Sequence, residues 1–325
     1  MREALNLALD EALKADDRVF LLGEDIADPG ASGPTAGLST KYGHDRVLDT
    51  PISEAAIVGA AIGAAIDGML PVAEIMIMDF IGIAIDQIVN HAAKLRFMSG
   101  GRTSCPITVR TAVFGGLGSG ATHSQSLEAW FMHIPGMKVI VPSTPRDGKG
   151  LLTSAIFDED PCLFVETVRL QSKKGPVPVE PGFSIPLGQA DIKRPGTDVS
   201  VISYGRAVHE ALAAAATLAD QGVSAEVVDL RTLVPLDVET IVESARRTRR
   251  AVIVHDAVQF AGPGAEIAAI LQSELFGELV APVERVGARF VPNPAAAALE
   301  AQVYPSAARI VDAVQRTLDR AKVHG

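Results

Sequence analysis

Two residues of this chain combine a reactive side chain with a position where a loop runs into an expected helix. Glu54 opens the small, apolar segment AAIVGAAIGAA, and His123 follows a glycine-rich stretch and opens SQSLEAWF. Burial raises the pKa of a glutamate and suits it to proton transfer, and a histidine titrates near neutral pH. The two positions therefore predict acid–base chemistry at the ends of two loops.

Each residue also has an ordinary structural explanation. A glutamate in a first helical turn interacts well with the helix dipole, and a lone histidine at a helix entry is commonly structural. Gly59 and Gly63 weaken the first explanation, because they lie on one helix face. They predict that this face is buried against another helix, either of the same chain or of another subunit. The glycines before His123 let that loop approach a ligand, but no Lys-Ser/Thr pair follows, which excludes a Walker-type phosphate loop.

Composition limits the class of protein. The chain has 325 residues, of which 48% are hydrophobic and 5% aromatic, enough for two aliphatic cores. The net charge of −10 argues against a nucleic-acid partner. The two cysteines, Cys105 and Cys162, have neither metal-ligand spacing nor a disulfide pattern, which favours a reducing, cytoplasmic compartment. Every long apolar run is interrupted by Gly, Pro or Asp, so no membrane span is expected, and the N-terminus lacks the features of a targeting peptide.

Strand-like and helix-like segments alternate along the chain. β-branched runs between amphipathic segments predict an α/β fold in which parallel sheets are covered on both faces. We expect a first domain at 1–178, a Pro-rich linker at 179–197 and a second α/β domain at 198–325. The elements expected in the first domain are a helix over 3–15, a strand over 19–23, a long loop over 26–44, and helices from Ser53, over 81–97, from Ser124 and from Arg146.

Several segments occur in the order typical of one enzyme family. LLGEDIA, RVLDTPISE, DQIVNHAAK, HSQSLEAWF and EVVDLRTLVPLD resemble the beta subunit of the thiamine-diphosphate-dependent first component of 2-oxo acid dehydrogenase complexes. The resemblance extends from residue 1 to about residue 290 and is closest to acetoin and pyruvate dehydrogenase beta subunits. It implies a transketolase-like pyrimidine-binding domain followed by a domain like the transketolase C-terminal domain.

The resemblance also implies a role for individual residues. Glu54 would hydrogen-bond the aminopyrimidine ring nitrogen of thiamine diphosphate, promoting the tautomer that takes a proton from the thiazolium carbon. Phe80, which by itself could simply pack in the core, would stack on the aminopyrimidine ring. His123 would orient or protonate substrate intermediates and assist acyl transfer to a lipoyl group.

Partners and ions follow from the same resemblance. An alpha subunit would hold the cofactor diphosphate through Mg²⁺ and a Gly-Asp-Gly motif, which this chain lacks, in an α2β2 heterotetramer. A lipoyl acyltransferase core would accept the acyl group. A structural K⁺, bound mainly by backbone oxygens, would lie at Ile107, Ala155, Asp158 and Asp160.

The substrate and two other functions stay open. Ile83 stands where many pyruvate enzymes carry Gln, which favours a more apolar pocket and acetoin, and FVPNPAAAALEAQVYPS departs from the family pattern. A split transketolase that moves a two-carbon ketol unit without a lipoyl partner would share the Glu54 chemistry, although the HSQS sequence argues against it. A non-catalytic, beta-like assembly subunit is a third interpretation, against which the intact Glu54 and His123 argue.

Overall fold

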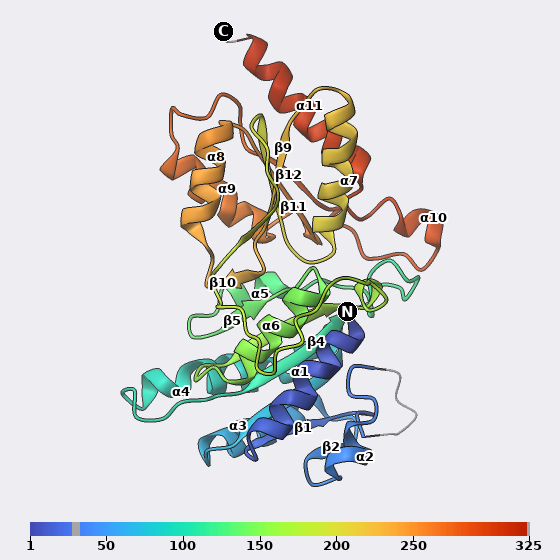
Figure 1. Cartoon of the computed structure of the whole chain (residues 1–325), viewed down its shortest axis with the longest axis vertical. Helices are drawn as coiled ribbons and strands as arrows, with labels where there is room; N and C mark the ends of the chain where they lie inside the picture. Colours follow the sequence, from blue (N-terminus) through green and yellow to red (C-terminus); the bar gives the residue numbers. More distant parts are fainter. Residues whose placement is uncertain (28–32, 324–325) are drawn as a thin grey trace. The chain divides into compact units, whose positions relative to one another are not determined.

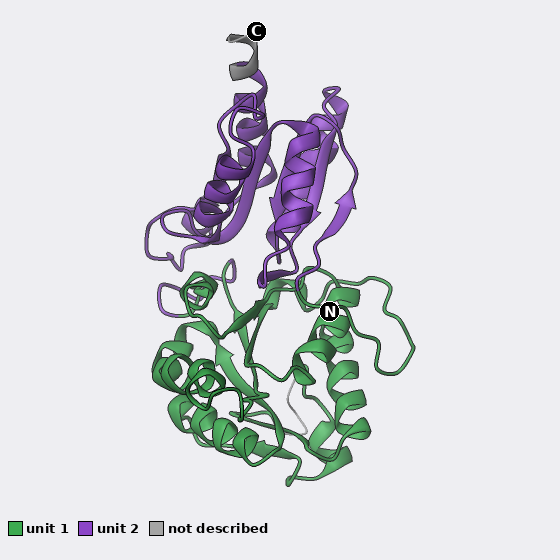
Figure 2. Cartoon of the chain, turned by 90° about the vertical axis from the view of Figure 1, so that its left-hand side faces the viewer, with its two compact units in different colours: residues 1–115, 123–187 green, residues 116–122, 188–325 purple. Residues whose placement is uncertain are grey.

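The computed structural model describes residues 1–27 and 33–323, which form two compact units (Figure 1). The first unit contains residues 1–115 and 123–187, and the second contains 116–122 and the chain from 188 onward (Figure 2). The short segment 116–122 therefore leaves the first unit and returns to it at His123.

The first unit is an α/β layer structure with a parallel sheet. Its strands are β1 (Val19–Gly23), β2 (Val47–Asp49), β3 (Leu70–Ile77), β4 (Thr108–Val113), β5 (Lys138–Ile140) and β6 (Cys162–Thr167), in the order β5-β6-β4-β3-β1-β2. Its helices are α1 (Arg2–Ala15), α2 (Leu38–Tyr42), α3 (Glu54–Ile66), η1 (Met78–Ala84), η2 (Gln87–Ala92), α4 (Ala93–Met98), α5 (Glu128–Met132), α6 (Pro145–Ile156) and η3 (Val168–Leu170). Every neighbouring strand pair within this unit is parallel, as the continuous apolar strands predict.

Helices cover both sides of this sheet (Figure 2). Helices α1 and α6 pack on each other, and their buried side chains join those of the strands in one cluster that includes Leu5, Leu9, Leu151 and Phe164. Helix α3 packs against β3 and against η1 and η2. Burial of such aliphatic side chains stabilises the unit by about 25 cal/mol per Å² of apolar surface.

The second unit is a smaller α/β structure. Its strands are β7 (Asp191–Arg194), β8 (Val199–Ser203), β9 (Ala225–Asp229), β10 (Thr232–Val234), β11 (Ala251–Val258) and β12 (Glu284–Ala288). Its helices are α7 (Ala207–Asp220), α8 (Val238–Thr248), α9 (Pro263–Glu274), α10 (Ala297–Glu300) and α11 (Ala307–Val323). The five-stranded sheet has the order β12-β11-β8-β9-β7, with α7 and α11 on one side and α8 and α9 on the other (Figure 1).

Three segments differ from their sequence-based expectations. Residues 191–194, expected in the linker, form β7, which pairs antiparallel with β9 at the sheet edge. The segment 81–97 is not one helix, because the 3₁₀ helix η1, the π-helix η2 and α4 follow one another there. The loop expected over 26–44 contains α2, and its residues 28–32 lie outside the described part of the chain. Within the described residues, no helix is long and apolar enough to cross a membrane.

Candidate functional site

Glu54 is the first residue of helix α3, as the sequence predicts. Ser53 occupies the N-cap position, but its side chain makes no capping hydrogen bond. The Glu54 residue is only 6% exposed, so its carboxylate lies at a positive helix end with little surrounding water. Strand β2 ends just before this helix, which places Glu54 at the carboxyl end of the parallel sheet, where α/β proteins commonly bind ligands.

A second carboxylate, Glu24, lies near Glu54. Burial, followed by the nearby Asp25 and Glu54 carboxylates, raises the pKa of Glu24 above its ordinary value. Glu24 also lines a cavity of about 510 Å³ with Glu74, Arg110 and other residues of the first unit. In the sequence, GED at 23–25 is only a weak signal, because two acids after a strand are commonly just solvated.

The small-residue face of α3 is only partly covered. A side chain at Gly59 would contact Gln87 of η2 at 3.9 Å, so η2 approaches the helix there. A side chain at Gly63 would meet nothing within 4 Å, and Ala60 beside it is exposed. The expected packing against another helix is therefore present at Gly59, while the rest of the face is open within this chain.

His123 does not open a helix, and the expectation of a helix from Ser124 is wrong. Helix α5 begins at Glu128, so neither Ser124 nor Ser126 caps it. The main chain after His123 is bonded elsewhere, because the Gln125 N–H donates to the Asp79 carboxylate at 3.3 Å. A helix from Ser124 would direct the Leu127 N–H to the His123 carbonyl oxygen, but this donor bonds the sulfur of Met78 at 3.4 Å instead.

The structure brings Phe80 and His123 together. Phe80 lies in η1 and His123 in the loop before α5, and their ring centroids are 5.3 Å apart at an interplanar angle of 80°. This edge-to-face geometry is favourable for aromatic rings. Helix α3 packs against η1, so the elements that carry Glu54, Phe80 and His123 are neighbours in one unit.

The glycine-rich loop before His123 is held by a residue that the sequence did not identify. The N–H groups of Gly116 and Gly118 each donate to the Glu300 carboxylate at 2.8 Å, within the second unit. Gly118 has a φ of +72°, and an added side chain would lie 3.1 Å from the Ala295 carbonyl oxygen. These two amides are therefore satisfied by the protein itself, which argues against a phosphate cradle there. Because 184 residues separate Gly116 from Glu300, no local pattern could reveal the pair.

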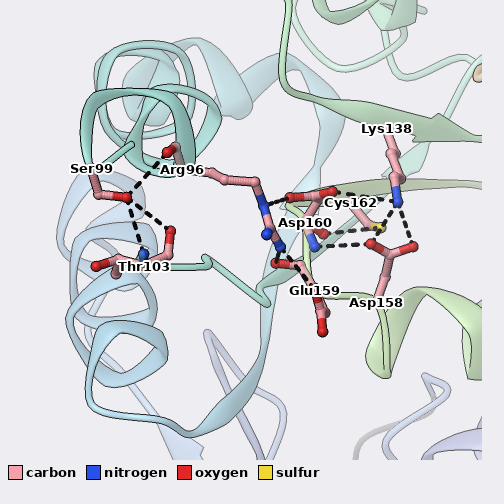
Figure 3. Close-up of polar contacts among 8 residues, drawn as sticks. All are labelled: Arg96, Ser99, Thr103, Lys138, Asp158, Glu159, Asp160 and Cys162. Carbon is pink, nitrogen blue, oxygen red and sulfur yellow. Dashed lines mark hydrogen bonds and ion pairs between the residues drawn. The ribbon is translucent and has the colours of Figure 1, made fainter. Parts of the chain in front are cut away.

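Two of the four predicted K⁺ positions, Asp158 and Asp160, belong to a cluster of ion pairs in the first unit (Figure 3). Lys138 Nζ donates to both carboxylate oxygens of Asp158, at 2.6 and 2.7 Å, and Arg96 Nε donates to Asp160 Oδ1 at 2.6 Å. The carbonyl oxygens of Ile107 and Ala155 each accept a main-chain hydrogen bond.

A carbonyl oxygen has two lone pairs, so these main-chain oxygens can also coordinate K⁺. The carboxylates of Asp158 and Asp160 are already neutralised by Lys138 and Arg96. Among the described residues, no group of three or more His, Cys, Asp or Glu side chains could hold a metal ion. The K⁺ site therefore stays a prediction.

Both cysteines are free and buried. Burial raises the pKa of the Cys105 thiol to about 12 and raises that of Cys162 as well. Neither thiol is suited to be a nucleophile near neutral pH, because the thiolate is the reactive form.

Comparison with known proteins identifies both units. Residues 1–172 match the transketolase pyrimidine-binding domain, and residues 188–310 match the transketolase C-terminal domain. The chain is 47% identical to the acetoin:2,6-dichlorophenolindophenol oxidoreductase subunit beta of Cupriavidus necator, covering 98% of this chain and 97% of that protein. It is 45% identical to the pyruvate dehydrogenase E1 component subunit beta-2, mitochondrial, of Oryza sativa subsp. japonica, covering 99% and 86%.

A solved structure shares the same architecture. The split-gene transketolase described as an inactive beta4 tetramer superimposes with a TM-score of 0.81 at 25% identity, covering 98% of each chain. The fold and site thus define a transketolase-like α/β protein. Within that class, the chain belongs to the family of beta subunits of thiamine-diphosphate-dependent acetoin and 2-oxo acid dehydrogenases, which are oxidoreductases.

Proposed function

We propose that this chain is the beta subunit of a first component that cleaves acetoin or a 2-oxo acid and transfers the acyl group to a lipoyl carrier. The observation that carries the proposal is the contact between the Phe80 and His123 rings beside the helix that opens on buried Glu54. An aromatic face, a carboxylate and an imidazole are the groups that a thiamine-type reaction needs from this subunit.

The residues present fit an aminopyrimidine ring. Phe80 is partly exposed, so its ring is accessible for stacking, and Glu54 offers a shielded carboxylate oxygen to a ring nitrogen. When bound, thiamine diphosphate supplies the carbon nucleophile that attacks the substrate carbonyl. Glu54 holds a proton at the aminopyrimidine nitrogen, and His123 orients the substrate oxygen or moves a proton to it.

The proposal includes a partner, because this chain offers only part of a cofactor site. The sequence contains no Gly-Asp-Gly motif, so an alpha subunit supplies the Mg²⁺ and diphosphate site, in an α2β2 heterotetramer. The exposed Ala60 and Gly63 on α3 support close approach of another chain, since small residues let backbones come near each other. A lipoyl acyltransferase core accepts the acyl product, and we assign the assembly to the cytoplasm.

Two finer assignments belong to the same proposal. The pyrimidine-binding domain is assigned to 1–178, and the linker is shortened to 179–187 because β7 at 191–194 already belongs to the second sheet. A K⁺ ion is assigned to the backbone oxygens of Ile107, Ala155, Asp158 and Asp160. Its test is the melting temperature in KCl against equal NaCl: a higher value in KCl supports the site, and equal values contradict it.

Acetoin is the substrate that the chain favours. Ile83 lies on η1, the element that carries Phe80, and is 57% exposed, so it presents an apolar side chain close to the site. An apolar wall suits the methyl groups of acetoin or a short 2-oxo acid. The relative with 47% identity is named for acetoin oxidation, which supports the same choice.

The direct test of the proposal is Glu54→Ala in the enzyme assembled with its alpha partner. Removing the carboxylate should slow hydrogen exchange at the reactive carbon of bound thiamine diphosphate at least ~100-fold, the usual range for general acid–base catalysis. Proton NMR after acid quenching measures that rate. Glu239→Ala is the matched control, because Glu239 also lies in the first turn of a helix, α8, but is exposed. Near-normal exchange in Glu54→Ala would contradict the assignment.

Non-oxidative ketol transfer is the alternative, favoured by the likeness of the whole chain to a split-gene transketolase. It requires the same Glu54 chemistry but no lipoyl acceptor. An enzyme that exchanges hydrogen normally, transfers a two-carbon unit to an aldose and leaves lipoamide unacylated would establish this alternative.

A further inference from the structure

Asp79 makes three hydrogen bonds to a single residue in the loop that carries His123. The Gln125 main-chain N–H lies 3.3 Å from each carboxylate oxygen of Asp79, and Gln125 Nε2 donates to Asp79 Oδ1 at 2.8 Å. Hydrogen bonds to a carboxylate are stronger than those between neutral groups. Asp79 therefore holds both the backbone and the side chain of the residue two positions after His123.

The contacts on either side of Asp79 follow the same register. Phe80 meets the His123 ring, and the Leu127 N–H donates to the sulfur of Met78 at 3.4 Å. Three successive residues of η1 thus bind alternate residues of the loop 123–127. Asp79 is the central member of this arrangement, and Gln125 lies between the two other loop residues that η1 contacts, His123 and Leu127.

The contacts between Asp79 and Gln125 lie outside the hydrophobic core. Gln125 is exposed and Asp79 is only partly buried, and exposed polar pairs contribute little to global stability. The same contacts fix the backbone path of the loop at Gln125, because the main-chain N–H and the side chain of this residue bond one carboxylate. Their effect is thus local and falls on the orientation of the neighbouring imidazole.

We propose that Asp79 is a positioning residue for His123. Its carboxylate fixes the loop 123–127 so that the imidazole keeps its edge-to-face contact with Phe80 and reaches the substrate. This inference rests on the proposed function, in which His123 acts on the substrate. Asp79 itself touches neither substrate nor cofactor in this role.

The test uses Asp79→Ala in the full enzyme with its alpha partner and thiamine diphosphate. Because a displacement of about 1 Å can cost ~100-fold in rate, kcat should fall 10- to 100-fold. The KM for acetoin and the Kd for cofactor should change less than about twofold. Asp79→Asn should recover part of the rate, since its amide oxygen can still accept the Gln125 N–H.

The matched control is Asp86→Ala. Asp86 also accepts a hydrogen bond from a side-chain amide, that of Asn90 at 2.7 Å, but has no contact to the His123 loop among the hydrogen bonds of the described residues. Its kcat should equal that of the wild type. The double variant Asp79→Ala/His123→Ala should be no slower than His123→Ala alone, because one residue acts through the other. Additive losses, or a normal kcat in Asp79→Ala, overturn the proposal.

A second readout does not depend on turnover. Hydrogen exchange of the Gln125 amide should be faster in Asp79→Ala than in the wild type and unchanged in Asp86→Ala. Unchanged exchange in Asp79→Ala overturns the positioning role even if activity falls. A wild-type enzyme that is inactive with every substrate overturns the proposed function instead, whatever the exchange rates are.

Discussion

At the scale of single residues, His255 shows how strongly this fold shields a titratable group. Its Nδ1 bonds the Ala257 carbonyl oxygen at 2.9 Å, and its Nε2 is buried without a hydrogen-bond partner among the described residues. Gly262 and Gly264 lie so close that an added side chain would come within 2.8 Å of the ring. Burial lowers the pKa of His255 to about 4.

This shift predicts a loss of stability in weak acid. Between pH 6.5 and pH 4 the unfolded chain binds a proton at His255 that the folded protein does not. The free energy of unfolding is therefore unaffected by His255 above pH 6.5 and should fall by roughly 2 kcal/mol from pH 7 to pH 5. In His255→Gln, the free energy of unfolding measured with urea should fall by roughly 2 kcal/mol less than in the wild type over the same pH range.

His44→Gln is the control for this measurement, because His44 is exposed and its replacement should leave the pH dependence of the wild type. The same pH dependence in His255→Gln and in the wild type would show that His255 does not resist protonation in the folded state.

At the scale of elements, an ion-pair network ties three neighbouring strands of the first sheet. Arg110 of β4 donates from Nε to Glu166 of β6 at 2.9 Å and from Nη1 to Glu74 of β3 at 2.7 Å, and its side chain is 2% exposed. The buried guanidinium is stable here because two carboxylates neutralise its charge. Each carboxylate in turn needs the arginine as its counter-charge.

Arg110→Met should consequently destabilise the protein by about 3–5 kcal/mol, because it leaves uncompensated buried charge. Urea unfolding at pH 7 measures the change. Adding Glu166→Gln to the same variant should restore part of the lost stability, since it removes one of the two orphaned charges. An Arg110→Met protein within about 1 kcal/mol of the wild type would contradict this account of the strands.

The elements differ in how far the sequence alone predicts them. Strand β1 lies at 19–23 as expected, because a continuous apolar run between polar segments has few other ways to be buried. The helix expected from Ser124 begins later, and the Leu127 N–H that it would use bonds Met78, 49 residues earlier in the chain. Local propensity cannot register such a contact. The same reason hides Glu300, whose partners Gly116 and Gly118 lie in a distant part of the chain.

The site residues follow the same division. Glu54 is predictable, because a helix start after a short strand fixes both its position and its surroundings. The contact between Phe80 and His123 is not, because neither residue's spacing reveals that η1 and the loop after β4 meet. The roles proposed for Phe80 and His123 come from the family resemblance, and their proximity is seen only in the fold.

At the scale of the whole molecule, the chain has the two units of a transketolase-like subunit and should need a second chain for cofactor binding. The isolated chain should bind thiamine diphosphate at least ~100-fold more weakly than the assembly with an alpha subunit, since we propose that the alpha subunit supplies the diphosphate site. Isothermal calorimetry with Mg²⁺ present measures both affinities. Tight binding by the isolated chain would contradict the division of the site between two subunits.

The most direct measurement is a substrate panel on the assembled enzyme. The chain would be purified with the product of the neighbouring reading frame, supplied with thiamine diphosphate and Mg²⁺, and assayed for reduction of an artificial electron acceptor. Acetoin, pyruvate and branched-chain 2-oxo acids would be compared. We predict reduction with one of them, with acetoin as the first choice, and its loss in Glu54→Ala. A stable, cofactor-bound assembly that reduces the acceptor with none of them would contradict the dehydrogenase assignment and favour non-oxidative ketol transfer.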